Sequence, residues 1–280
     1  MTKPASPTPD SFVDCVHHAI EGRLAELRAC LDAEPSLVHA RSAAPFRATL
    51  LHYATAANGV ENELQRTPPN AVEIATLLLD RGAEADALSD SYGGGPNATS
   101  LCLLVSSWHP FEAGVQPELV QLLVERGARV NGLEDDGMPL ATALRFGYSS
   151  AARMLANCGA RIDNLFFAAG LGDIARVSSF FSESEGQPPV APEVVQEGLH
   201  FAVSHGHLEV AQYLLDRGAS VTGTSLGHHC ELPLHQTIFV KRWEAARWLL
   251  KKGADLDAVD GKRGETARAM AGGQLSSDDR

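Results

Sequence analysis

The sequence has no run of about 18 apolar residues, the length that an α-helix needs to cross a bilayer. Its first ten residues are polar and rich in proline, so they lack the apolar centre of a secretory signal peptide. The five cysteines are odd in number and scattered, which favours reduced thiols in a reducing compartment over a disulfide scaffold. We therefore expect a soluble, cytoplasmic protein with no membrane-spanning segment.

Signatures of catalysis and of cofactor binding are also missing. The sequence has no Gly-Lys-Ser/Thr phosphate loop and no Cys-x-x-Cys or His-x-x-x-His pair of a metal site. The formal net charge of −12 disfavours a nucleic-acid backbone or an anionic membrane as the main partner. We expect no cofactor, no metal and no nucleic acid.

What the sequence does contain is a repeat. An apolar pair, often with His, is followed by a small residue, by Gly, and by an apolar stretch that closes in Leu-Leu and Gly-Ala; the best copy spans 199–219. Spacings near 33 residues indicate stacked helix-turn-helix units rather than one globular core. The closing Gly-Ala pairs begin at Gly82, Gly127, Gly159, Gly218 and Gly253.

This periodicity predicts an all-α solenoid of about seven helix pairs over 11–272, with a C-terminal capping helix near 264–271. We expect disordered tails at 1–10 and 273–280, and an irregular joint at about 160–192, where the fifth unit lacks its Gly-Ala closure. The second and third units carry inserts near 60–70 and 109–116. Each closing Gly is expected to adopt the left-handed conformation that ends a helix.

Several stretches resemble the ankyrin repeat family. They are Leu-Pro-Leu-His at 232–235, Leu-His at 199–200 with Gly-His-Leu-Glu-Val at 206–210, and the five Gly-Ala closures. The resemblance implies a concave surface, built from first helices and inter-repeat loops, that binds partners. It also implies that His52, His200 and His235 hydrogen-bond to an adjacent loop. The stretches at 51–53, 57–61, 92–95 and 106–110 are similar to those of uncharacterised bacterial ankyrin proteins, which suggests a bacterial source.

On this surface we expect partner contacts from side chains in the loops or at the turns. Trp243 stands beside two cations, Lys241 and Arg242, and if exposed would make a good interface anchor; packing in the core or at the edge is the alternative, which we slightly favour. A phosphate cradle at Gly93–Gly95 and a zinc site from the histidines near Cys230 are weaker interpretations. The expected partner contacts are Tyr92, Asn97, Arg145, His228, His229 and Trp243.

A second candidate site lies at the inserts, which should be neighbours because they occupy the same position in adjacent repeats. Polar groups beside an indole could line a small-molecule pocket, or they could pin two long loops onto the solenoid. The residues concerned are Asn58, Glu61, Gln65, Arg66, Trp108 and His109.

The leading hypothesis is therefore a non-catalytic module that binds a protein partner on its concave face. The alternative is an enzyme or small-molecule receptor that uses the insert pocket, with Glu61 or His109 as the base and Trp108 as a wall.

Overall fold

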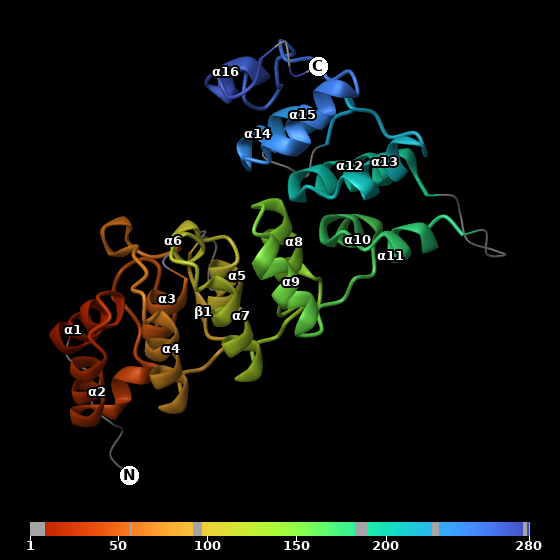
Figure 1. Cartoon of the computed structure of the whole chain (residues 1–280). Helices are drawn as coiled ribbons and strands as arrows, with labels where there is room; N and C mark the ends of the chain where they lie inside the picture. Colours follow the sequence, from red (N-terminus) through yellow and green to blue (C-terminus); the bar gives the residue numbers. More distant parts are fainter. Residues whose placement is uncertain are drawn as a thin grey trace. The chain divides into compact units, whose positions relative to one another are not determined.

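The computed structural model describes residues 9–56, 58–91, 97–182, 190–225, 230–276 and 279 (Figure 1). The described part of the chain is mostly helical, and it divides into two compact units. Unit 1 comprises Met1–Thr142 and Arg153–Ala160, and unit 2 comprises Ala143–Ala152 and Arg161–Arg280.

Unit 1 is a stack of antiparallel helix pairs, α1 with α2, α3 with α4, and α5 with α7 (Figure 1). First helices pack on first helices and second helices on second helices, so α3 lies against α1 and α5, and α4 lies against α2 and α7. The helices are α1 (Pro9–Ile20), α2 (Leu24–Ala33), α3 (Leu50–Thr55), α4 (Ala71–Asp80), α5 (Ser100–Leu104), α6 (Trp108–Glu112) and α7 (Gln116–Glu125), with short 3-10 turns η1 (Pro35–His39) and η2 (Asn62–Leu64).

The stacking explains why a single repeat would not be stable in isolation. In α4 the consecutive side chains of Leu77, Leu78 and Leu79 are all buried, so they spread over more than one face of the helix. Only neighbours on both sides can cover such a helix, and each neighbour contributes apolar burial worth about 1.5–3 kcal/mol per large side chain.

A two-stranded antiparallel ribbon and an isolated antiparallel β-bridge between Val259 and Thr266 depart from an all-α description. The strands of the ribbon are β1 (Leu88–Ser89) and β2 (Ala98–Thr99), with Leu88 opposite Thr99 and Ser89 opposite Ala98. The sequence analysis did not predict this ribbon, because two residues are too few to show the alternation of a strand.

The helices of unit 2 continue the pairing, and the division between the units passes through the fourth pair, α8 (Met138–Arg145) and α9 (Ser149–Asn157). Counted over the described residues, seven pairs and a closing helix are present, so the predicted architecture is confirmed. The remaining helices are α10 (Leu165–Leu171), α11 (Ile174–Ser179), α12 (Pro192–His205), α13 (Leu208–Leu215), α14 (Pro233–Phe239), α15 (Trp243–Lys251) and α16 (Ala267–Ala271).

Helix α12 begins earlier than the sequence suggested. The best copy of the repeat pattern begins at Leu199, whereas α12 already starts at Pro192, at the end of the expected irregular joint, and runs for 14 residues. Its added turns pack on α10 through Gly198, where a Cβ atom would overlap the Leu165 side chain and lie 3.2 Å from Leu214 Cδ1. The absence of a side chain at Gly198 therefore sets the close approach of α12 to α10.

Two conformational expectations are confirmed. The closing glycines all have left-handed φ values, from 92° at Gly82 to 98° at Gly127. The pattern histidines hold the following loops: the Nε2 atoms of His52, His200 and His235 lie 3.3, 3.2 and 3.1 Å from the carbonyls of Ala98, Gly223 and Ala258.

The chain beyond α16 packs against unit 2. Leu275, which the sequence analysis assigned to a disordered tail, is 4% exposed within the apolar cluster of unit 2. The carboxylate of Asp279 accepts a hydrogen bond from Arg247 Nε at 3.0 Å. A single apolar residue among Gly and Ser gives no periodic signal, so this contact could not be read from the sequence.

Candidate functional site

The turn between α14 and α15 holds a lysine where the regular repeat has glycine. Lys241 N–H donates to the Ile238 carbonyl (3.0 Å) and Arg242 N–H to the Thr237 carbonyl (2.7 Å), the bond pattern that also closes the turn at Gly206. Lys241 adopts φ 58° for this purpose, against 81° at Gly206. A left-handed non-glycine residue is uncommon, and such residues concentrate at functional sites.

Arg242, the next residue, is half-buried, and its guanidinium donates hydrogen bonds to three uncharged acceptors. Its Nε donates to the Ser204 carbonyl (3.3 Å), and its Nη2 donates to the Gly147 carbonyl (3.3 Å) and to the Ser149 hydroxyl (2.9 Å). No carboxylate of the described residues forms an ion pair with this guanidinium, and burial lowers its pKa. Arg242 is therefore a partly desolvated cation without a counter-charge in this part of the chain.

Behind Arg242 lies a buried Ser–His pair, Ser149 with His205. The His205 Nε2 atom is 2.8 Å from the Leu144 carbonyl, which requires a proton on Nε2, so Nδ1 accepts a hydrogen bond from Ser149 Oγ at 2.7 Å. Burial lowers the pKa of His205 to about 3. Such an imidazole is a weak base at neutral pH, and its outer partner is a carbonyl rather than a carboxylate, so the pair has a structural role.

In front of the turn is an open pocket of about 430 Å³. The end of α12 and the start of α13 form one wall, and the turn and the first residues of α15 form the other. Trp243, the first residue of α15, lines this pocket with the two cations and Glu244; it is half-buried and packs against the apolar cluster of unit 2. The lining residues are His205, Gly206, Leu208, Lys241, Arg242, Trp243, Glu244 and Ala245, which we call the turn pocket.

Three of the six expected partner contacts, Asn97, Arg145 and Trp243, belong to the described residues. Arg145 and Trp243 are the last residue of α8 and the first residue of α15. Arg145 Nε is buried and has no hydrogen-bond partner among the described residues. Asn97 is exposed and its N–H donates to the Ser89 carbonyl at 2.9 Å. Tyr92, His228 and His229 lie outside the described residues.

Most side chains of the second candidate site are used to fix the inserts. Asn58 Nδ2 donates to Ser106 Oγ at 3.0 Å, and Gln65 Nε2 donates to the Val60 carbonyl, also at 3.0 Å. Arg66 is exposed and donates to the Glu63 carbonyl at 2.9 Å. These bonds support the pinning interpretation of the insert residues rather than a shared pocket.

Trp108 and His109 belong to the short helix α6, which replaces the loop expected at 109–116. Trp108 is 49% exposed, lies with its ring centroid 5.5 Å from that of Phe111 in a tilted arrangement, and donates from Nε1 to Glu112 at 3.1 Å. The sequence analysis missed the residue that anchors this insert: Gln116, only 1% exposed, whose Nε2 donates to the Leu104 carbonyl at 2.8 Å.

Glu61 faces α1 rather than Trp108. It accepts a hydrogen bond from the Tyr53 hydroxyl at 2.8 Å, and both side chains line a pocket of about 360 Å³. Phe12 and Val13 of α1 supply its apolar wall. Glu61 therefore lines a pocket with residues of the first repeat, and Trp108 and His109 are not among the residues that line it.

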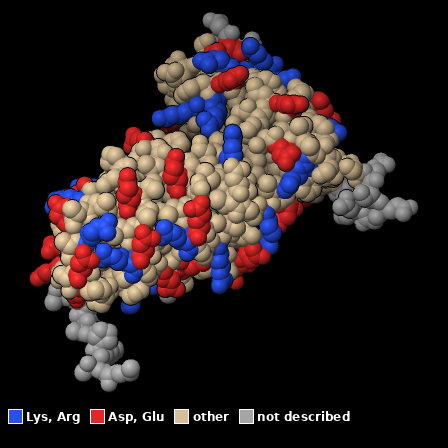
Figure 2. Space-filling view, turned by 60° about the horizontal axis from the view of Figure 1, so that its bottom comes forward, with Lys and Arg blue, Asp and Glu red and all other residues tan. Residues whose placement is uncertain are grey.

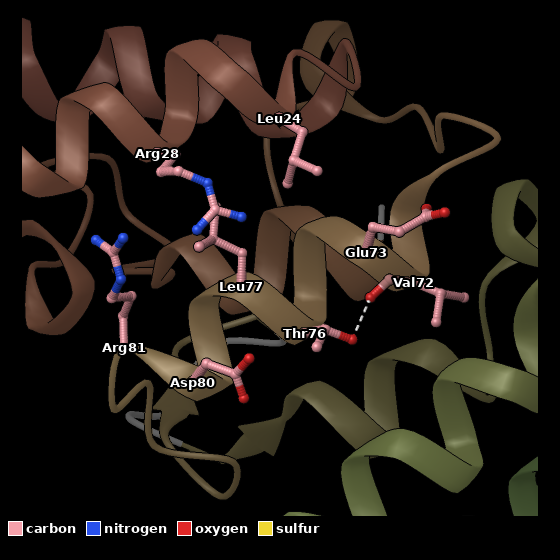
Figure 3. A pocket seen from close by; sticks show the side chains of 8 residues that line it. All are labelled: Leu24, Arg28, Val72, Glu73, Thr76, Leu77, Asp80 and Arg81. Atoms are coloured by element: carbon pink, nitrogen blue, oxygen red, sulfur yellow. Dashed lines mark hydrogen bonds between the residues drawn. The ribbon is translucent and has the colours of Figure 1, made fainter.

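A further hollow, of about 400 Å³, lies between α2 and α4 (Figure 3). Its charged side chains include members of ion pairs: Arg81 pairs with Asp32 at 2.8 Å and Asp80 with Arg126 at 2.7 Å. Acidic and basic side chains are likewise interspersed on the face drawn in Figure 2. Neither view shows a large surface patch of like charges that would favour binding of a charged polymer.

The described residues contain neither a group of metal ligands nor a membrane-spanning helix. No group of three His, Cys, Asp or Glu side chains comes together as metal ligands would. No helix there has both the length and the apolar character to cross a membrane.

Comparison with known proteins identifies the repeat. The family model of ankyrin repeats, in three copies, matches residues 165–260. This segment consists of ankyrin repeats. The structure of the human ASB11 ankyrin repeat domain is similar, with 21% identity, 94% of each chain covered and a TM-score of 0.46. No curated protein matches the sequence. The ankyrin segment contains α10 to α15. It therefore includes Arg242 and all the residues that line the turn pocket.

Proposed function

We propose that this chain is a non-catalytic module that binds a protein partner. Ankyrin repeats typically serve protein–protein interaction, and the turn pocket carries the residue types that dominate interface energetics, an arginine and a tryptophan side by side. The observation that carries the proposal is Trp243, which is half-buried and lines an open pocket with Lys241, Arg242 and Glu244. Asn97 and Arg145 are proposed as further contacts, with Tyr92, His228 and His229.

The same proposal places the protein in the cytoplasm of a bacterium. The described structure leaves all five cysteines as free thiols, and two of them, Cys15 and Cys230, are buried. Buried thiols behave as small apolar side chains and suit a reducing compartment.

In-cell photo-crosslinking followed by reconstitution tests the binding function. A photoreactive residue is placed at Glu244, in the turn pocket, and in a control at Glu73, in the hollow of Figure 3. We expect a protein to crosslink from Glu244 and the same protein, purified, to bind the purified chain with a defined stoichiometry. If proteins that crosslink in cells show no binding when purified, the proposal is wrong.

The pocket at Glu61 favours a second candidate function, a small-molecule receptor. The volume of this pocket falls in the lower range of ligand sites. The pocket combines an apolar wall with the Glu61 carboxylate, which accepts hydrogen bonds from the Ser42 and Tyr53 hydroxyls. A thermal-shift screen of metabolites against the protein and against Glu61→Gln tests it. A ligand that stabilises the parent protein but not E61Q would establish this receptor function, and the absence of any such ligand would remove it.

A further inference from the structure

We propose that the turn pocket binds an acidic side chain of the protein partner, with the carboxylate on Arg242 and Lys241 and a neighbouring apolar side chain against Trp243. This inference rests on the proposed binding function and adds the chemistry of the partner.

The first support is charge. Of the pocket's titratable side chains, Lys241 and Arg242 are cationic and Glu244 is anionic. His205 stays neutral near pH 7, because burial lowers its pKa to about 3. The pocket is therefore net positive in a chain whose formal net charge is −12, so a local attraction for carboxylates opposes the character of the rest of the molecule.

The second support is the geometry of the guanidinium. Arginine carries five N–H donors, and Arg242 uses the one on Nε and the two on Nη2. Nη1 bonds to no described residue, and it is not among the buried atoms that lack a partner, so it is accessible to a ligand. A carboxylate on Nη1 would give the desolvated cation the counter-charge that it lacks, in a charge-assisted hydrogen bond.

The third support is the way in which the turn is held. Because Arg242 is fixed to the backbone carbonyls of Ser204 and Gly147, its side chain loses little rotamer freedom when it binds. Lys241 occupies the strained left-handed position in the same turn, so both cations belong to one rigid element. The backbone N–H groups of the first turn of α15, which has no side-chain cap, add to the attraction for an anion.

The volume of the pocket favours a peptide segment as the source of the carboxylate. About 430 Å³ holds an acidic side chain together with one apolar neighbour, and the indole of Trp243 offers that neighbour a flat apolar surface. A small free anion would leave this surface unused.

The test uses two dye-labelled short peptides that differ only in charge, one with a Glu-Phe-Glu centre and one with Gln-Phe-Gln. Fluorescence anisotropy measures their affinity for the full chain and for Lys241→Gln, Arg242→Gln and Lys251→Gln. Lys251 is an exposed lysine in the last turn of α15, outside the pocket, so its variant makes the same charge change elsewhere.

We expect the Glu peptide to bind and the Gln peptide to bind at least tenfold more weakly. K241Q and R242Q should each lose at least tenfold in affinity for the Glu peptide, whereas K251Q should stay within twofold of the parent. Affinity should also fall as salt rises. Because Arg242 also holds the turn, K241Q decides the result if R242Q does not fold.

The proposal is overturned if the Glu peptide does not bind, if the Gln peptide binds equally well, or if K251Q loses as much affinity as K241Q. Inorganic phosphate that displaces the Glu peptide at the peptide's own concentration would likewise assign the pocket to a small anion. A crosslinked partner that binds the parent and K241Q equally would leave the binding function intact and remove only this site.

Discussion

The Arg242 guanidinium donates a 2.9 Å hydrogen bond to the Ser149 hydroxyl across 93 residues of chain. A Cβ atom added to Gly147 would lie 2.9 Å from Val240 Cγ1, so the two turns also touch through apolar atoms. In a regular solenoid each repeat contacts only its neighbours. Here the turn after α8 meets the turn before α15, so a contact within unit 2 joins the fourth and seventh repeats.

Ser149→Ala should destabilise the protein by about 1–3 kcal/mol, because it leaves both His205 Nδ1 and one Arg242 N–H without a partner. Urea denaturation provides the measurement. The control is Ser150→Ala, an exposed neighbour in the same helix, which should change the free energy of unfolding by less than about 0.5 kcal/mol. Equal effects of the two variants would show that the hydroxyl of Ser149 is not part of a buried network.

Stability should fall as the pH drops from 6.5 toward 4. Burial lowers the pKa of His52 and His200 from 6.5 to about 4, and that of His205 to about 3. In this range the unfolded chain binds protons that the folded protein does not, so each of these histidines lowers the free energy of unfolding as the pH falls. Above pH 7 the histidines are neutral in both states and the dependence vanishes.

Urea midpoints at pH 7.5, 6 and 5 measure this dependence for the parent and for His205→Asn. The variant should be less stable at pH 7.5, because it loses bonds to Ser149 and Leu144, but its stability should depend less steeply on pH. A parent protein whose stability is flat between pH 7 and 5 would contradict the prediction.

Much of the architecture could be predicted because each repeat carries its own local signals. The Gly-Ala closures fix where second helices end, and His52, His200 and His235 occupy one position of the pattern and make the same bond to the next loop. Signals that recur in several repeats reinforce each other, so the number of pairs could be read without any knowledge of long-range contacts.

The candidate site was less predictable for a physical reason. Trp243 could be singled out beside the cations Lys241 and Arg242. Their surroundings could not, because Ser149 and Gly147 come from a repeat that the periodicity places far away. Contacts across an irregular joint depend on its geometry, which a single sequence does not encode as a pattern.

Gln116→Ala should cost about 1–3 kcal/mol, because the Gln116 side chain satisfies two buried carbonyls, of Leu104 at 2.8 Å and of Ser107 at 3.3 Å. The matched control is Gln121→Ala in the same helix, whose exposed side chain bonds to Glu125. We expect that control to stay within about 0.5 kcal/mol of the parent. Limited proteolysis adds a second readout, since cleavage within α6 should accelerate in Q116A but not in Q121A.

Gly198→Ala should destabilise the protein, although alanine is the better helix former by about 1 kcal/mol. The added methyl group would overlap the Leu165 side chain, and overpacking of this kind costs about 1–3 kcal/mol. Truncation of Leu165 should remove this overlap, so that G198A leaves the free energy of unfolding unchanged or raises it in a Leu165→Ala background.

A double-mutant cycle in urea measures this coupling, with Leu165→Val as a milder background if L165A does not fold. A coupling free energy above about 1 kcal/mol would establish that Gly198 sets the separation of α10 and α12. Stabilisation by G198A in the parent background would instead show that the helices have room for a methyl group. The early start of α12 at Pro192 would then need another cause, because the added turns would not depend on close packing at Gly198.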